Sequence, residues 1–179
     1  MRKYQISCPI VIKHLPSHER YRDELLSLIK QSDGQLIEGS NNVDHITSGD
    51  FFCQNASKLY TPLFLTIVKD VVKQLIDEFV DISSTELKFE VRGLWYQQYQ
   101  KNDTHHWHDH AINSTFSVIY YLELPRGTPG TEFLDPFTNR VHRPKVKEGD
   151  ILMFPSFVRH RSPENKSDQI KTIISLNLI

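Results

Sequence analysis

Apolar residues in the first half of the chain recur every three to four positions over two stretches, which predicts two amphipathic helices. The first stretch is 17–31, where Ser17 is a candidate N-cap. The second covers about 61–80 and has Pro62 in its first turn, where proline is well tolerated. Residues 32–56 between them are polar and irregular, so we expect two helices joined by a loop that can order over a site.

From Leu87 onward the apolar period is two, which predicts seven or eight short strands. The apolar run YQISCPIVI near the N-terminus is expected to form a further strand. Helices followed by a run of strands predict a mainly β fold, with the helices packed on the outside of a β-sandwich or barrel. The predicted turns between the strands are 102–103, 125–130, 135–139 and 148–150.

Two of these strands have one apolar face and one mixed face. In the strand over 115–124, one face consists only of bulky apolar residues, which predicts that it faces the core. In the strand over 170–179, the face opposite the apolar one carries Lys171 and two polar groups. A mixed face fits the lumen of a barrel better than a packed core. Because Tyr121 lies on the mixed face of the first strand, we expect Tyr121 and Lys171 to point into the same cavity.

The composition is that of an ordinary globular protein. Of the 179 residues, 39% are hydrophobic and 24% are charged, which excludes fibrous and disordered classes. The 21 basic and 22 acidic residues leave a formal charge of -1, so a nucleic acid partner is not expected. Because the chain shows no linker and no repeat, we expect a single domain over 1–179, with a strand and helices in 1–86 and the β core in 87–179.

The cysteine content and the apolar runs bear on location. Cys8 and Cys53 are too few for a disulfide framework, which suits a reducing compartment. No run of 18 uncharged apolar residues is present, and the N-terminal segment lacks the cleavage site of a signal peptide, so no membrane association is expected. We therefore expect a cytoplasmic protein.

Histidine is the residue type that stands out, because four of the nine histidines fall within six positions, at 105, 106, 108 and 110. On a strand, His108 and His110 share one face, where two imidazoles can converge on one ion. A third ligand is expected from His160, which follows a strand and a bend. Three such ligands leave about three open positions on an octahedral ion, enough for a bidentate molecule and dioxygen. Imidazole by itself suits iron, zinc, copper and nickel alike.

The side chains next to this pair are expected to play other parts. His105 and His106 fit a polar surface strand, and Trp107 is expected to pack in the core. Asp109 points away from His108 and His110 if the strand is regular, whereas a local bulge would exchange its role with that of His110.

Five short segments follow one another between residues 95 and 178. They are His108-Asp109-His110, Ser117-Val118-Ile119-Tyr120-Tyr121-Leu122, Phe133-Leu134-Asp135-Pro136, Phe154-Pro155-Ser156 with His160, and Ser175-Leu176-Asn177. In order and spacing they resemble the 2-oxoglutarate and Fe(II)-dependent oxygenases, specifically a group of short bacterial and phage members with a His-x-His...His site.

The resemblance implies a double-stranded β-helix, which is a jelly-roll or cupin-like barrel, with Fe(II) in its lumen. It also implies a dioxygenase that uses O2 and takes 2-oxoglutarate as co-substrate. Hydroxylation of the substrate is then coupled to decarboxylation of 2-oxoglutarate to succinate and carbon dioxide. By position, His108, His110 and His160 are the implied metal ligands and catalytic residues.

Two positions depart from the pattern of most of these enzymes. His110 stands in place of an Asp or Glu ligand, which makes the site one charge more positive and favours an anionic co-substrate. Lys171 stands in place of the arginine that binds the far carboxylate of 2-oxoglutarate, and it supplies a point charge instead of a bidentate fork. Tyr121 is a further candidate contact to that carboxylate, followed by Tyr99 and Ser175.

Other functions are compatible with three histidines on a β scaffold. A zinc hydrolase or hydratase would use the open position to activate water, but it has no use for Lys171 in the lumen. A thiol dioxygenase would use iron without 2-oxoglutarate, and a metal-binding or sugar-binding β module would have no turnover. The expected substrate is a small molecule or a protein side chain, held by loops at about 32–56 and 125–145. The oligomeric state is left open.

Overall fold

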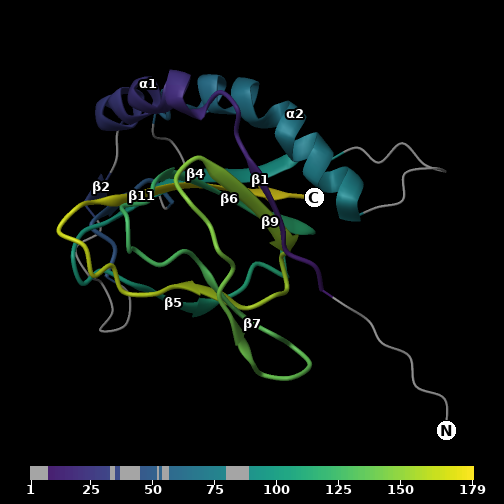
Figure 1. Ribbon diagram of the computed structural model, residues 1–179. Coiled ribbons are helices and arrows are strands. Elements are labelled where there is room, and N and C mark those ends of the chain that lie inside the picture. The colour runs from purple at the N-terminus through teal and green to yellow at the C-terminus, as the bar shows by residue number, and fades with distance from the viewer. Residues whose placement is uncertain (1–7, 33–34, 37–44, 52, 54–56, 80–88) are drawn as a thin grey trace, which may run out of the picture.

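The computed structural model describes residues 8–32, 35–36, 45–51, 53, 57–79 and 89–179. Within these ranges the chain forms two helices and two antiparallel sheets (Figure 1). In spatial order, the larger sheet contains β1 (Val11–His14), β9 (Asp150–Pro155), β6 (Phe116–Glu123), β11 (Lys171–Leu178), β4 (Val91–Tyr99), β3 (Ser48–Gly49) and β2 (Gln35–Leu36). The smaller sheet contains β5 (His105–His108), β10 (His160–Ser162), β7 (Glu132–Leu134) and β8 (Val141–His142).

The helices α1 (His18–Gln31) and α2 (Thr61–Phe79) confirm the two helical periodicities within one residue at each end. Both lie over one face of the larger sheet (Figure 1). There Leu25 of α1 and Phe64 of α2 join the same apolar core as Tyr120 of β6. Ser17 occupies the N-cap position of α1, but its side chain makes no capping hydrogen bond. Neither helix of the described part has the length and apolar character needed to cross a bilayer.

The opposite face of the larger sheet looks toward the smaller sheet (Figure 1). Alternate residues of β6 separate as the sequence predicts, because Val118 lies in the core under the helices whereas Ile119 lies between the sheets. In β11, Ile174 and Ile173 separate in the same way. The mainly β architecture with two helices is therefore confirmed. The closed double-stranded β-helix stays a prediction.

Strand β11 sets the register of the inner face because it pairs with β4 on one side and with β6 on the other. At one end, Lys171 is opposite Tyr99. In the middle, Ser175 lies between Trp95 and Ile119. At the far end, Asn177 lies between Gly93 and Ser117. The inner face thus runs from a cation at one end to an amide at the other.

The N-terminal strand and the loop expected at 32–56 are described only in part. Strand β1 occupies the end of the apolar N-terminal run, and residues 1–7 lie outside the described residues. Of the loop, β2 and β3 extend the larger sheet next to β4, and residues 37–44 and 54–56 lie outside the described residues.

The loop between β10 and β11 is held by Asn165, which is fully buried. Its Nδ2 donates hydrogen bonds to the carbonyl oxygens of Tyr99 and Gln169, both at 2.9 Å, and its Oδ1 accepts one from the backbone N–H of Ser167 at 3.0 Å. We expect Asn165→Ala to lower the free energy of unfolding by about 2–4 kcal/mol, because several buried groups lose a partner together. Urea denaturation measures this change. The exposed Asn113→Ala serves as control, and equal losses in the two variants would contradict the assignment.

Candidate metal centre and adjoining cavities

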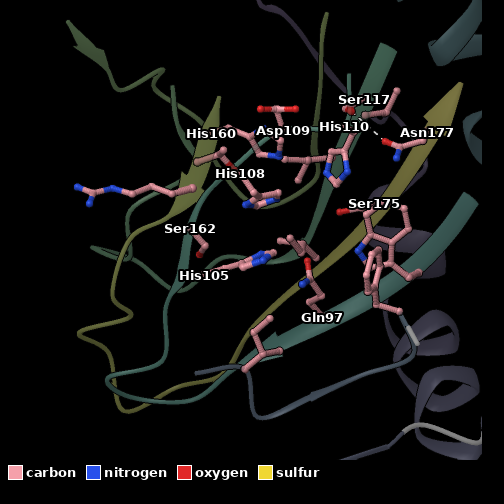
Figure 2. A pocket seen from close by; sticks show the side chains of 18 of the residues that line it. Gln97, His105, His108, Asp109, His110, Ser117, His160, Ser162, Ser175 and Asn177 are labelled. Atoms are coloured by element: carbon pink, nitrogen blue, oxygen red, sulfur yellow. Dashed lines mark hydrogen bonds between the residues drawn. The ribbon is translucent and has the colours of Figure 1, made fainter. Parts of the chain in front are cut away.

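Three histidines meet in the space between the sheets (Figure 2). One potential ligand atom from each of His108, His110 and His160 lies within 4.8 Å of the other two. The ring centroids are 4.3 Å apart for His108 and His160, 5.1 Å for His108 and His110, and 5.3 Å for His110 and His160. The structure thus brings together the three histidines that the sequence singled out.

The way in which His110 reaches this position differs from the expectation. We expected His108 and His110 to share one face of a strand, but β5 ends at His108 and His110 lies in the turn that follows. The backbone N–H of His110 donates to the carbonyl oxygen of Ser156 at 2.9 Å, in the bend after β9. A contact between distant loops, and not strand alternation, therefore places the His110 imidazole.

The third side chain comes from β10. Its first residue, His160, is opposite His108 in β5, so the pairing of two short strands sets these two rings side by side. His160 is buried, whereas His108 and His110 are partly exposed. Among the three rings, solvent therefore reaches His108 and His110 and not His160.

The hydrogen bonds and the burial of these rings suit metal binding. Nδ1 of His108 is 2.7 Å from the carbonyl oxygen of His106, and Nδ1 of His160 is 3.0 Å from that of Val158. A carbonyl can only accept, so Nδ1 carries the proton and Nε2 keeps its lone pair in the neutral ring. Burial, with the neighbouring His108, lowers the pKa of His110 to about 4. Burial also lowers the pKa of His160 well below its ordinary value. Neutral imidazoles are the form that binds a divalent transition metal.

The neighbours of the cluster do not all behave as expected. His106 is exposed as predicted, but His105 lines the cavity and stacks on His108, with ring centroids 3.9 Å apart. The cause is an irregular register: the two steps from His160 to Ser162 in β10 span three steps in β5, from His108 to His105, so that Ser162 is opposite His105. No local pattern in the sequence signals this shift.

Trp107 and Asp109 also have definite places. We expected Trp107 to pack in the core, but it is partly exposed. The guanidinium of Arg161 lies over its ring, with the guanidinium carbon 4.7 Å from the ring centroid. Asp109 is exposed, and its Oδ1 accepts a hydrogen bond from the backbone N–H of Ala111 at 3.3 Å. In Figure 2 its carboxylate points away from the three rings. The geometry thus groups His110, and not Asp109, with the other two histidines.

A cavity of about 330 Å³ adjoins the three histidines, and we call it the inner cavity. Tyr99 and Ser175, both singled out from the sequence, line it. Apolar walls come from the larger sheet, with Ile119 of β6, Ile173 of β11 and Phe154 of β9 among them.

We expected Lys171 to point into the cavity, but it does not line the inner cavity; it lies behind Ser162, which does, and is 1% exposed. Its Nζ donates to Ser162 Oγ at 2.9 Å and to the carbonyl oxygen of Pro129 at 3.2 Å. None of the ion pairs within the described ranges includes Lys171, and burial lowers its pKa to about 7. An ammonium has three donors, so one N–H remains for an anion. Ser162, its neighbour, lines the inner cavity.

Tyr121 is close to Lys171, whose Nζ lies 6.0 Å from its ring centroid, but its hydroxyl is already engaged. That hydroxyl donates to Thr131 Oγ1 and accepts from the Thr131 backbone N–H, both at 2.9 Å. Thr131 lines the inner cavity, whereas Tyr121 stands behind it. The expectation that Tyr121 points into the cavity is thus corrected, because its single hydroxyl proton orients Thr131.

Neither protein-family models nor curated proteins match this sequence. Solved structures do match. An oxidoreductase of the 2OG-Fe(II) oxygenase family from Burkholderia pseudomallei has a TM-score of 0.68 and 12% identity, over 94% of this chain and 83% of that one. A Pseudomonas putida prolyl-4-hydroxylase has a TM-score of 0.65 and 11% identity, over 96% and 92%. HygX from Streptomyces hygroscopicus, solved with nickel, 2-oxoglutarate and hygromycin B, has a TM-score of 0.67 and 9% identity, over 96% and 82%.

The chain has the 2-oxoglutarate oxygenase fold. At these identities the likeness concerns the fold, and the more specific placement in a short bacterial and phage group stays a prediction. Within this fold, His108 lies on β5, His110 in the turn after it, His160 on β10 and Lys171 on β11, so only the tertiary structure brings the four residues near one another.

A second cavity of about 680 Å³, the outer cavity, adjoins the inner one. Phe51, Trp95, Asp109, His110 and Asn177 line both. Sequence reasoning missed Trp95 and assigned no role to Asn177. The signal for Asn177 was its position on the mixed face of the last strand, two residues after Ser175.

Proposed function

We propose that the protein is an Fe(II)- and 2-oxoglutarate-dependent dioxygenase that hydroxylates a small molecule or a protein side chain. The observation that carries the proposal is the pairing of a three-histidine cluster with a buried ammonium that has no ion-pair partner within the described ranges, both beside one cavity. Two proteins of the same fold support the choice of co-substrate, because HygX and a viral collagen prolyl hydroxylase were solved with 2-oxoglutarate.

His108, His110 and His160 are the proposed ligands of Fe(II). When bound, Fe(II) supplies the reaction of O2 with 2-oxoglutarate, in which one oxygen atom enters succinate as carbon dioxide leaves and the other enters a substrate C–H bond. Burial lowers the pKa of His110 and of His160 and so favours their neutral form, and the Nδ1 protons of His108 and His160 are directed to carbonyl oxygens. With no anionic ligand among the three histidines, the full charge of the ion is available to attract a dicarboxylate.

Lys171 is the proposed partner of the far carboxylate of 2-oxoglutarate. Its remaining N–H and its charge, held in a dry environment, favour an anion strongly over water. Tyr99, whose ring centroid lies 5.3 Å from Nζ, and Ser175 complete the proposed contacts along β4 and β11. Tyr121 contributes by fixing the orientation of Thr131.

Anaerobic spectroscopy tests this function. Adding Fe(II) and then 2-oxoglutarate to the protein is expected to produce a visible metal-to-ligand charge-transfer band, and Zn(II) with 2-oxoglutarate is the colourless control. Fe(II) binding without a band on adding 2-oxoglutarate would contradict the proposal and favour a thiol dioxygenase. Tight Zn(II) binding with no effect of 2-oxoglutarate would favour a hydrolase or hydratase. If the protein binds a metal but catalyses neither an oxygenase reaction with Fe(II) nor a hydrolase or hydratase reaction with Zn(II), it is a binding module.

A further inference from the structure

The outer cavity extends from the end of β11 that is opposite to Lys171. We propose that it binds the substrate, and that Asn177 anchors the substrate through a carbonyl or carboxylate oxygen. This inference rests on the proposed function, since it assigns Lys171 to the co-substrate and Asn177 to the substrate. The two residues are six positions apart on one strand, which corresponds to roughly 20 Å. A molecule as short as 2-oxoglutarate cannot reach both ends.

A chain of buried hydrogen bonds orients the Asn177 amide. Ser117 Oγ donates to Asn177 Oδ1 at 2.9 Å, as the dashed line in Figure 2 shows. Ser117 has one hydroxyl proton, so Ser156 Oγ, also at 2.9 Å, donates to it in turn. Because Oδ1 is taken by Ser117, the Nδ2 group is turned away from it, and no hydrogen bond of Nδ2 occurs among the described residues. Asn177 lines both cavities and therefore presents two N–H donors at their junction.

Gly93 keeps the space next to this amide open. It is opposite Asn177 in the pairing of β4 and β11, and it lines the outer cavity. A Cβ at Gly93 would meet only the Trp95 ring, at 3.4 and 3.8 Å, so the fold itself does not demand glycine here. Glycine inside a strand often marks a place where a ligand comes close to the backbone. The missing side chain leaves room for a group that bonds to Asn177.

The remaining walls indicate what such a ligand carries besides its acyl oxygen. Phe51 and Trp95 form an edge-to-face pair with centroids 5.0 Å apart, which suits an apolar or aromatic body. Arg92 is exposed on the wall and has no ion pair within the described ranges, whereas Lys58 is held by the carbonyl oxygen of Leu94 at 2.6 Å. The ligand class is thus an apolar molecule with an acyl oxygen. If the acyl group is an anionic carboxylate, the charge of Arg92 strengthens its binding.

Three probes of nearly the same shape test this assignment: phenylacetate, phenylacetamide and phenethylamine. Their binding to protein loaded with Zn(II) and 2-oxoglutarate is measured by ligand-observed NMR. We expect the acid and the amide to bind, and the amine, which has no acyl oxygen, to bind about tenfold more weakly, the cost of one net hydrogen bond. Arg92→Ala is expected to weaken phenylacetate alone. A preference for the acid indicates a carboxylic acid substrate, and equal binding of the amide indicates a peptide-like carbonyl.

Two variants address the anchor and the space beside it. Asn177→Leu is expected to weaken both acyl probes about tenfold, and Gly93→Val to abolish their binding, while the affinities for Zn(II) and 2-oxoglutarate stay unchanged. The exposed Gln100→Leu is the matched amide control. Unchanged probe binding in Asn177→Leu, or tight binding of phenethylamine, would overturn the inference, and so would a loss of 2-oxoglutarate affinity in that variant.

The same measurements separate this inference from the proposed function. If the wild-type protein binds Zn(II) and 2-oxoglutarate but none of the three probes at millimolar concentration, only the assignment of the outer cavity is wrong. If it fails to bind Zn(II) or 2-oxoglutarate, the proposed function is wrong. Retained Zn(II) and 2-oxoglutarate binding in Asn177→Leu and Gly93→Val also shows that both variants are folded.

Discussion

Replacing His160 by alanine will lower the affinity for a divalent metal by at least about 100-fold, because the variant loses one of only three proposed ligands, and even the loss of an outer contact to a metal site costs up to that much. The natural reporter is Trp95, whose ring centroid lies 5.7 Å from that of His110. The sequence has two tryptophans, so Trp107→Phe leaves Trp95 as the single source of tryptophan fluorescence. Titration with Co(II) should quench this emission in the parent protein and not in His160→Ala.

The control for this experiment is His106→Ala on the same strand as His108. The His106 side chain is exposed, and the bond that it provides to His108 comes from its backbone carbonyl, which the substitution keeps. His160 is buried, so urea unfolding in the presence of a chelator must show that the variant folds. His108→Ala, at a partly exposed position, is the second variant and should lose metal as well. Full metal affinity in both folded variants would show that the assignment of a three-histidine metal centre is wrong.

Replacing Lys171 by methionine is expected to have two effects of opposite sign. The affinity for 2-oxoglutarate should fall about 100-fold, because a charge-assisted bond in a dry site is worth about 3 kcal/mol. The free energy of unfolding without ligand should rise on the order of 2 kcal/mol. Removing a buried ammonium that has no counter-ion stabilises the folded protein, and the loss of the hydrogen bond to Ser162 offsets part of this gain. Isothermal titration calorimetry and urea denaturation measure the two effects. A lysine that only supports the structure would show a loss of stability instead.

The pH dependence follows from the same group. Burial holds the pKa of Lys171 at about 7 in the folded protein, below the 10.5 of an exposed lysine. Between these values the unfolded chain binds a proton that the folded protein lacks. The contribution of this lysine to the free energy of unfolding therefore rises with pH from 7 to 10.5. Below pH 7 the lysine destabilises the folded protein by a constant amount. A bound carboxylate favours the charged form, so 2-oxoglutarate affinity should fall by up to about tenfold per pH unit above 7. In Lys171→Met the pH dependence of 2-oxoglutarate affinity should vanish, and the stability should lose the part of its rise that this lysine contributes between pH 7 and 10.5.

The matched control is Lys145→Met, at an exposed lysine outside both cavities. Neither the affinity for 2-oxoglutarate nor its pH dependence should change in this variant. If Lys145→Met and Lys171→Met weakened 2-oxoglutarate binding equally, the effect would be one of net charge, and the assignment of Lys171 to the far carboxylate would be wrong.

Much of the candidate site could be predicted from the sequence because it depends on local geometry. Residues two apart in a strand share a face, so the alternation along the last strand is enough to put Lys171, Ser175 and Asn177 on one side. The density of histidines at 105–110 marked the candidate metal centre in the same way. These features need only the backbone period.

Other parts of the site depend on contacts that no period describes. His110 is placed by a bond to Ser156, 46 residues away in the chain, and His105 enters the cavity because the register between β5 and β10 slips. The Tyr121 hydroxyl is used by Thr131, which the sequence did not suggest as its partner. Each of these arrangements has alternatives of similar local energy, and contacts with neighbouring segments of the chain stabilise the one that is observed.

The sequence by itself determined the two helices, the change to strands, which face is mixed in the two strands over 115–124 and 170–179, and which histidines are candidate ligands. These follow from side-chain periodicity and residue chemistry, which act over a few residues. Only the tertiary structure decided that three imidazoles meet, that Lys171 lies buried behind Ser162 without an ion-pair partner in the described part of the chain, and that Asn177 faces two cavities. The reason is that sheet register and loop-to-loop hydrogen bonds join residues far apart in the chain, and burial then sets their protonation and their orientation.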